Sequence, residues 1–193
     1  YYGSAMTTLS VNVIKDPTQR INVTFSLLGD DQHDSEKDKI THVLSVGTLK
    51  TWLEPKKYNV SANATVGDVL KMVLANNGMS CSNPQGNYVQ SITRNGETLG
   101  EFDNGRFSGW MYTLNGVHPN FAVDQQYLEN DDVIVFHYTD NYYYEESSPS
   151  YKEVKTVLNT VQKINNIGTV VLNSNCKNKI DAARSTYNTL SAG

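Results

Sequence analysis

Apolar and polar residues alternate along the first part of the chain, from about residue 8 to residue 28. Apolar positions recur at every second residue on both sides of a turn sequence, Lys15-Asp16-Pro17-Thr18, and after it they are Ile21, Val23, Phe25 and Leu27. A period of two places such side chains on one face of a strand. The pattern predicts a β-hairpin, and strand-like character resumes over 41–60 after a highly charged stretch at 29–39.

A helix is predicted to begin at Thr65 and to end near Gly78. Thr65 can cap the free amides of the first turn, and Asp68 sits three residues later as the reciprocal acid of a capping box. Apolar residues at helical spacing form one stripe, which consists of Val66, Val69, Leu70, Val73 and Leu74. Gly78 supplies the left-handed residue that ends the helix.

Two Asn-Gly pairs mark tight turns between later strands. Asn95-Gly96 lies between strand-like segments at 88–92 and 97–99, and Asn115-Gly116 follows the segment 110–114. Asn-Gly is the strongest short signal of a hairpin, because both residues tolerate a positive φ. The β-branched and aromatic run at 133–138 predicts one more strand.

The composition changes at residues 145–149, Glu-Glu-Ser-Ser-Pro, which is typical of a linker. Ser150 and Glu153 then form a second capping box ahead of an apolar stripe that Gly168 closes, and a second helix follows with Ile180, Ala183, Tyr187 and Leu190. We therefore expect a β-rich domain over 7–144, a linker over 145–149, and a helical hairpin over 150–193 that has the pattern of a truncated three-helix repeat.

The composition indicates a polar, turn-rich globular chain and excludes some partners. Hydrophobic residues make up 38% of the 193 residues and charged residues 19%, and the net charge is −4. Without a run of Lys and Arg the chain lacks the electrostatic footprint of a nucleic-acid-binding protein. No stretch approaches the roughly 20 apolar residues that span a bilayer. We expect neither a nucleic-acid partner nor a membrane span.

A longer pattern runs from Thr65 to Tyr138, where the capped helix is followed by Gly86-Asn87-Tyr88-Val89, then Ser108-Gly109-Trp110-Met111-Tyr112-Thr113-Leu114-Asn115-Gly116, then Asp132-Val133-Ile134-Val135-Phe136. The pattern resembles an uncharacterised domain family of Gram-positive surface proteins, similar to the C-terminal β-domain of transcobalamin and intrinsic factor. The resemblance implies an α+β fold with a β-grasp-like mixed sheet packed on one helix, and the strand and helix patterns fit this independently. The segment 150–193 resembles the small helical repeats of clostridial extracellular proteins.

The resemblance implies a candidate ligand-binding hairpin that contains Gly109, Trp110 and Tyr112. In the vitamin carriers the β-domain holds cobalamin against a large helical barrel, and nothing in this chain could form that barrel. Trp110 and Tyr112 share one face of a strand, so their rings either pack in the core or form a ligand platform. At Gly109 a backbone could approach a ligand closely.

Acidic residues and a histidine crowd one predicted loop, and they are Asp30, Asp31, His33, Asp34, Glu36 and Asp38. They could supply oxygen ligands to calcium, but their spacing matches no twelve-residue calcium loop. A charged loop that stays in water is the favoured interpretation. We therefore expect no metal site and no cofactor.

Catalytic patterns are absent from the sequence. The four histidines, His33, His42, His118 and His137, show no HExxH spacing, and neither a GxSxG elbow nor a P-loop occurs. Cys81 and Cys176 lie in different predicted units, which favours two isolated thiols over a disulfide bridge. The sequence therefore predicts a protein that is not an enzyme.

These patterns lead to a functional hypothesis. We expect an extracellular or cell-wall-associated, monomeric and non-enzymatic module of a bacterial surface protein, which binds a small molecule, a glycan or another protein. Two alternatives stay open at this point. One is a structural spacer that displays neighbouring domains, and the other is an accessory domain of a larger secreted enzyme.

Overall fold

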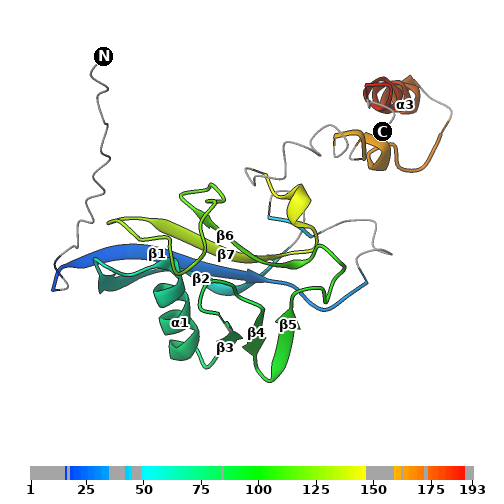
Figure 1. Cartoon of the computed structure of the whole chain (residues 1–193). Coiled ribbons are helices and arrows are strands. Elements are labelled where there is room, and N and C mark those ends of the chain that lie inside the picture. The colour runs from blue at the N-terminus through cyan, green and yellow to red at the C-terminus, as the bar shows by residue number, and fades with distance from the viewer. Residues whose placement is uncertain are drawn as a thin grey trace, which may run out of the picture.

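One helix, α1, lies among the strands of the β-rich part of the chain. The computed structural model describes residues 16, 18–34, 42–44, 49–83, 85–146, 159–161, 163–171 and 174–189. Figure 1 labels all but η1 of the elements, which are β1 (Arg20–Gly29), β2 (Lys50–Ser61), α1 (Val66–Asn76), β3 (Ser80–Ser82), β4 (Ser91–Arg94), β5 (Glu97–Gly100), β6 (Gly109–Leu114), β7 (Val133–Thr139), η1 (Tyr142–Tyr144) and α3 (Ser174–Tyr187).

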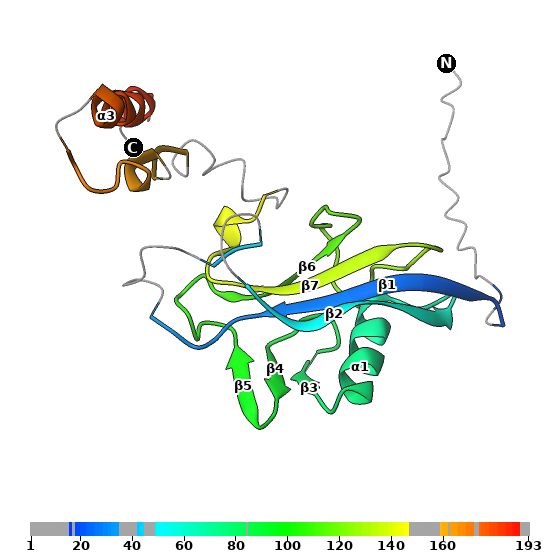
Figure 2. The same cartoon turned by 180° about the vertical axis from the view of Figure 1, so that it is seen from behind.

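Four strands form a mixed sheet in the order β2-β1-β7-β6. β1 runs parallel to β7, with Phe25 opposite Ile134, while β2 and β6 are antiparallel to their neighbours. Pro55 lies in β2, and it is tolerated there because β2 is an edge strand. Figures 1 and 2 both show α1 against one face of this sheet, which confirms the predicted α+β fold with a mixed sheet packed on one helix.

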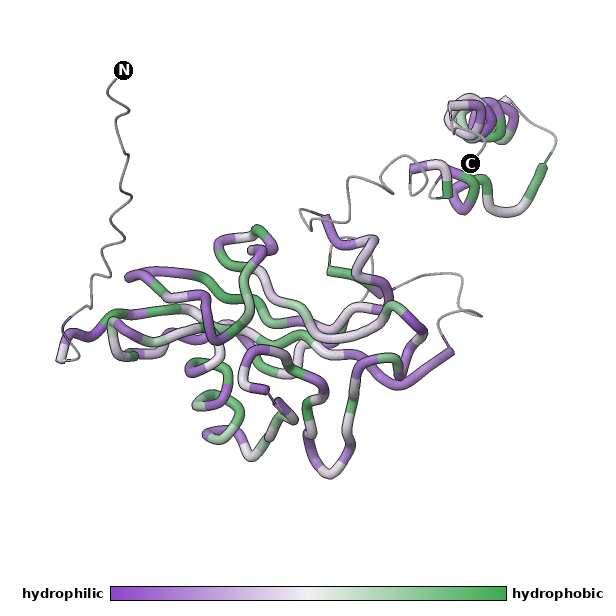
Figure 3. The backbone as a smooth tube through the Cα atoms, viewed as in Figure 1, coloured by the Kyte–Doolittle hydropathy of each residue, from purple (hydrophilic) through white to green (hydrophobic). Residues whose placement is uncertain are grey.

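The predicted capping box and stripe both form in α1. The Thr65 hydroxyl accepts a hydrogen bond from the Asp68 amide at 3.2 Å, and the Asp68 carboxylate accepts one from the Thr65 amide at 3.0 Å. Gly78 has a φ of 67°, as a left-handed helix end requires. In Figure 3 hydrophobic and hydrophilic positions alternate along α1, and its buried positions are Val66, Gly67, Val69, Leu70, Val73 and Leu74.

A smaller sheet, in the order β3-β4-β5, lies on the same side of the large sheet as α1 (Figure 2). Asn95 and Gly96 join β4 to β5 with φ values of 52° and 83°. Asn115 and Gly116 follow β6 with φ values of 53° and 81°. Positive φ at both central positions is the signature of the type I′ turn. Both predicted Asn-Gly turns are therefore confirmed.

The large sheet buries residues on both of its faces. Phe25 of β1 and Phe136 of β7 belong to the hydrophobic core that also contains the stripe of α1. Successive residues of a strand point to opposite faces, so His137 lies on the face away from α1. His137 is nevertheless fully buried, and so is Thr139 next to it on that face. The second face is thus covered as well, and its buried residues are polar.

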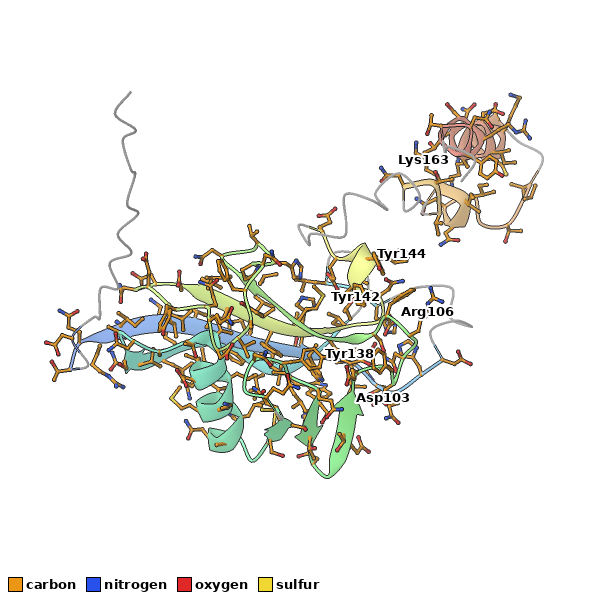
Figure 4. All side chains as sticks on the ribbon, viewed as in Figure 1. Asp103, Arg106, Tyr138, Tyr142, Tyr144 and Lys163 are labelled. Atoms are coloured by element: carbon orange, nitrogen blue, oxygen red, sulfur yellow. The ribbon has the colours of Figure 1, made fainter. Side chains whose placement is uncertain are left out.

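Two loops pack against each other at the end of the large sheet where β7 ends. The Tyr142 amide donates a hydrogen bond to the Phe107 carbonyl at 3.1 Å, and the Phe107 ring meets Tyr142 and Tyr143 edge-on. Figure 4 labels Arg106 and Tyr142 at this end. Glu145, the first residue of the predicted linker, is fully buried here. The tyrosine run thus packs on the loop before β6.

The described residues of the C-terminal part include two helical stretches. Residues 159–161 and 163–165 are helical, and α3 provides the second predicted helix. The Lys163 ammonium, labelled in Figure 4, donates to the Thr186 hydroxyl at 2.6 Å and so joins the two segments. None of the helices in the described ranges combines the length and the apolar character that a membrane crossing requires.

Some expectations fall outside the described residues. They concern the first strand of the predicted hairpin, the start of the helix at Ser150, most of the linker, and the loop positions Glu36 and Asp38. The domain limits 7–144 and 150–193 therefore stay predictions. Cys81 and Cys176 do not form a disulfide bridge with each other, as the sequence favoured.

Candidate metal centre

Asp30 and Asp140 follow two neighbouring parallel strands. β1 ends at Gly29 and β7 ends at Thr139, so each aspartate comes directly after its strand. Because the two strands run parallel, with Leu28 opposite His137, their carboxyl ends meet at one edge of the sheet. Both aspartates are buried, with exposed fractions of 4% and 3%.

Two histidines complete a group that we call the strand-end cluster, made of Asp30, His33, His42 and Asp140. His33 Nε2 lies 3.0 Å from Asp30 Oδ2 and 3.3 Å from Asp140 Oδ2. His42 Nδ1 lies 2.8 Å from Asp30 Oδ2 and 4.0 Å from Asp140 Oδ2. One potential ligand atom of each residue therefore converges on the same small volume.

Asn104 supports the strand-end cluster through hydrogen bonds. It is fully buried, and its amide nitrogen donates to Asp140 Oδ1 at 3.1 Å and to the Asp31 carbonyl at 2.9 Å. Its side-chain oxygen accepts a hydrogen bond from the His33 amide at 2.9 Å. One neutral side chain thus fixes residues on two separate segments, as outer-shell groups do around metal ligands.

Backbone amides orient the two carboxylates. The His42 amide donates to Asp140 Oδ2 at 2.8 Å, and the Asp31 amide donates to Asp30 Oδ1 at 2.8 Å. Burial raises the pKa of Asp140 above its ordinary value, although the bonds from His42 and Asn104 oppose this shift. The neighbouring Asp30 adds a repulsion in the same direction as burial. A cation placed between the two carboxylates would relieve both costs.

The ligand set fits a transition metal better than calcium. A tetrahedral zinc ion with bonds of about 2.0–2.2 Å keeps its ligand atoms about 3.3 Å apart. The separations of 2.8 to 4.0 Å between the histidine nitrogens and the carboxylate oxygens of the strand-end cluster lie on both sides of that value. Two imidazoles and two carboxylates suit zinc and its neighbours, whereas calcium requires six to eight oxygens.

An open groove of about 520 Å³ adjoins the strand-end cluster, and Asp30 belongs to its wall. The Trp52 ring is half-buried there, and the Arg94 guanidinium lies 5.4 Å from its centre. Lys50 forms an ion pair with Asp31 at the rim. An aromatic surface surrounded by charges of both signs suits a polar ligand with an apolar face.

The predicted ligand-binding residues lie elsewhere. Trp110 and Tyr112 are buried in the core, and their polar ends are satisfied by the carbonyls of Leu99 at 2.9 Å and Phe121 at 2.7 Å. Their rings also border a second, smaller pocket of about 210 Å³, whereas Gly109 pairs with Thr139 in the sheet. The structure therefore places neither ring in the strand-end cluster, and ligand binding by Gly109, Trp110 and Tyr112 stays a prediction.

The interpretation of 30–38 as a solvated loop is wrong for Asp30 and for His33, which both belong to the strand-end cluster. Asp30 is buried and bonded to two histidines, while Asp31 and Asp34 are exposed as expected. The parallel pairing of β1 with β7 buries Asp30, and no local pattern reports that pairing. Nothing in the sequence indicated a role for His42 or Asp140. The one available signal was that Asp30 and Asp140 each directly follow a strand.

Residues 63–140 match the model of a family described as a domain of unknown function, DUF4430. This range contains the segment on which the sequence resemblance rested. A comparison with curated proteins finds no match. A crystal structure from Ruminococcus gnavus, described as "a putative metal binding protein", is similar over 63% of this chain and 99% of its own, with 15% identity and a TM-score of 0.37. A TM-score this low does not establish a common fold.

Proposed function

We propose that the β-rich part of the chain is a non-enzymatic binding module whose strand-end cluster holds a divalent transition metal ion of the zinc class. The observation that carries the proposal is the convergence of two imidazole nitrogens and two carboxylate oxygens, all within 4.8 Å of one another. Asp140 lies 98 residues after His42, and His42 lies 12 residues after Asp30, so the fold brings distant parts of the chain together. Two carboxylates balance the charge of a divalent ion, which lowers the cost of its burial.

The groove beside the ion receives a polar small molecule or a glycan. Trp52 offers a ring face, and Arg94, Lys50 and Glu97 offer hydrogen-bonding groups around it. Asp30 links the groove to the strand-end cluster, so a ligand in the groove lies close to the ion. The extracellular location and the absence of enzymatic activity stay predictions from the sequence.

Calorimetric titration of the chelator-treated full chain with zinc and with calcium tests the metal proposal. We expect zinc to bind and calcium to give no heat, because the cluster offers nitrogen ligands. Asp30→Asn removes a ligand, so its loss of zinc affinity should exceed the roughly 10- to 100-fold loss typical of an outer-shell change. Asn104→Ala changes an outer-shell residue, so its zinc affinity should fall by roughly 10- to 100-fold.

Asp124→Asn is the matched control, because Asp124 is exposed and lies in a turn outside the strand-end cluster. It removes one carboxylate charge without touching a proposed ligand, and its zinc affinity should equal that of the wild type. If Asp30→Asn and Asp124→Asn bind zinc equally well, the strand-end cluster is a hydrogen-bonded network and the proposal fails.

A further inference from the structure

A second group of metal-ligating side chains lies on the face of the large sheet away from α1. His137 comes from β7, His118 from the turn region after β6, and Glu145 from the residue after η1. All three are buried, and one ligand atom of each lies within 4.8 Å of the others. We call them the buried triad. It shares no residue with the strand-end cluster.

The hydrogen bonds of the buried triad fix the protonation of both imidazole rings. His118 Nδ1 lies 2.8 Å from the Glu146 carbonyl, and His137 Nδ1 lies 3.0 Å from the Tyr138 carbonyl. A carbonyl oxygen only accepts, so each Nδ1 must carry a proton. In a neutral imidazole the other nitrogen is then an acceptor. The two Nε2 atoms, both acceptors, face each other at 2.9 Å.

The pair of neutral rings therefore needs one more proton or metal ion to satisfy its contacts. Three contacts each need a proton, whereas two neutral imidazoles supply two. Either a third proton or a metal ion must lie between the Nε2 atoms, because two lone pairs at that distance repel. A third proton would create an imidazolium inside the protein, where burial disfavours charge.

Glu145 supplies the negative charge that a metal ion needs. Its carboxylate is fully buried and accepts hydrogen bonds from the Leu44 amide at 3.0 and 3.2 Å. Its Oε1 lies 3.7 Å from His137 Nδ1. No lysine or arginine within the described part of the chain forms an ion pair with it. A carboxylate oriented by a backbone amide has the outer-shell support of a metal ligand.

We propose that His118, His137 and Glu145 form a second, buried site for a divalent transition metal ion of the zinc class. Two imidazoles and one carboxylate are an established zinc ligand set. Tetrahedral coordination would place the two Nε2 atoms about 3.3 Å apart, a few tenths of an ångström beyond their present separation. The proposal does not depend on the strand-end cluster, because the ligands of the two sites are different residues.

Counting bound ions in four versions of the full chain tests the proposal. The proteins are the wild type, Asp30→Asn, His118→Gln and the double variant, each loaded with cobalt or zinc and analysed for metal after gel filtration. We expect two ions in the wild type, one in each single variant and none in the double variant. In Asp30→Asn the visible absorption of the remaining cobalt should show four-coordinate geometry.

Other counts separate the two proposals. One ion in the wild type that Asp30→Asn removes and His118→Gln retains overturns the buried site and leaves the strand-end site standing. One ion that only His118→Gln removes supports the buried site and overturns the other. No ion in any protein means that the buried triad holds only a proton, which overturns both.

A second variant tests the buried site in case His118→Gln fails to fold. Glu145→Gln keeps an oxygen that can accept from the Leu44 amide, but it removes the charged ligand. Its circular dichroism should match that of the wild type, while it should bind the second ion at least roughly 10-fold more weakly. Wild-type occupancy and affinity in Glu145→Gln would overturn the role of this carboxylate and with it the proposed site.

Discussion

Glu145 shows how burial changes the chemistry of one carboxyl group. It lies at the end of the β-rich part, where composition alone indicates a solvated linker, yet it is fully enclosed. Burial raises its pKa to about 7, against the weaker opposing effects of the Leu44 amide and Thr139. Without a metal ion, Glu145 therefore favours the protonated form in the folded chain well above the pH at which an exposed glutamate ionises.

The pH dependence of unfolding should report this shift when a chelator is present. Because the folded pKa is raised from 4.5 to about 7, the folded chain binds the extra proton between those values. The stability contributed by the protonated group is complete below about pH 4.5 and is lost as pH rises through about 7. As the pH rises across this range, the unfolding free energy of the wild type should thus fall by about 3 kcal/mol relative to that of Glu145→Gln.

Denaturant unfolding of both proteins at several pH values measures the difference. His137, whose lowered pKa acts in the opposite direction, is present in both proteins and largely cancels in the comparison. Parallel curves of unfolding free energy against pH for wild type and Glu145→Gln would show that Glu145 is not buried as described.

At the scale of elements, α1 is the part that local sequence defines most completely. Its capping box closes through Thr65 and Asp68, and its stripe packs into the core. The strands depend more on their partners. β2 carries Pro55 and several exposed residues, and it is stable as an edge because β1 pairs with it along its length.

Removing the helix cap should lower the stability of the fold without affecting either proposed metal site. Thr65→Ala deletes the hydroxyl that accepts from the Asp68 amide, and we expect a loss of about 1 kcal/mol in the free energy of unfolding. Thr65→Ser keeps the hydroxyl and should lose much less. Denaturant titration measures the stability, and calorimetry should show unchanged zinc affinity in both variants. A zinc affinity that falls with the cap would mean that α1 supports the strand-end cluster directly.

At the scale of the whole molecule, the strand-end cluster ties distant parts of the chain together. Asp30 and Asp140 are far apart in the sequence, so an ion that binds between them would bind the folded chain and not the unfolded one. Zinc at about one hundred times its dissociation constant should raise the free energy of unfolding by about 2.7 kcal/mol at this site.

Thermal unfolding with and without zinc checks this expectation. The relevant quantity is the part of the stabilisation that Asp30→Asn abolishes, because the buried triad contributes separately if it also binds. Addition of a chelator should reverse the stabilisation. Equal stabilisation of wild type and Asp30→Asn would show that zinc acts at other residues.

The sequence by itself determined the local structure of this protein. Thr65 with Asp68, the stripe from Val66 to Leu74 and the turn at Asn95-Gly96 act over a few residues, so propensity and periodicity are enough to predict them. The mixed sheet packed on one helix followed from these elements together with the resemblance over Thr65 to Tyr138. The charge balance likewise depended only on composition.

Only the tertiary structure decided where the candidate chemistry lies. The parallel pairing of β1 with β7 brings Asp30 to Asp140, and the alternation of β7 turns His137 toward His118 on the opposite face. Neither event has a local signature, because strand pairing over a long stretch of chain depends on which surfaces the whole fold can bury together. Asp30 of the predicted solvated loop and Glu145 of the predicted linker are therefore buried, each beside histidines from other parts of the chain.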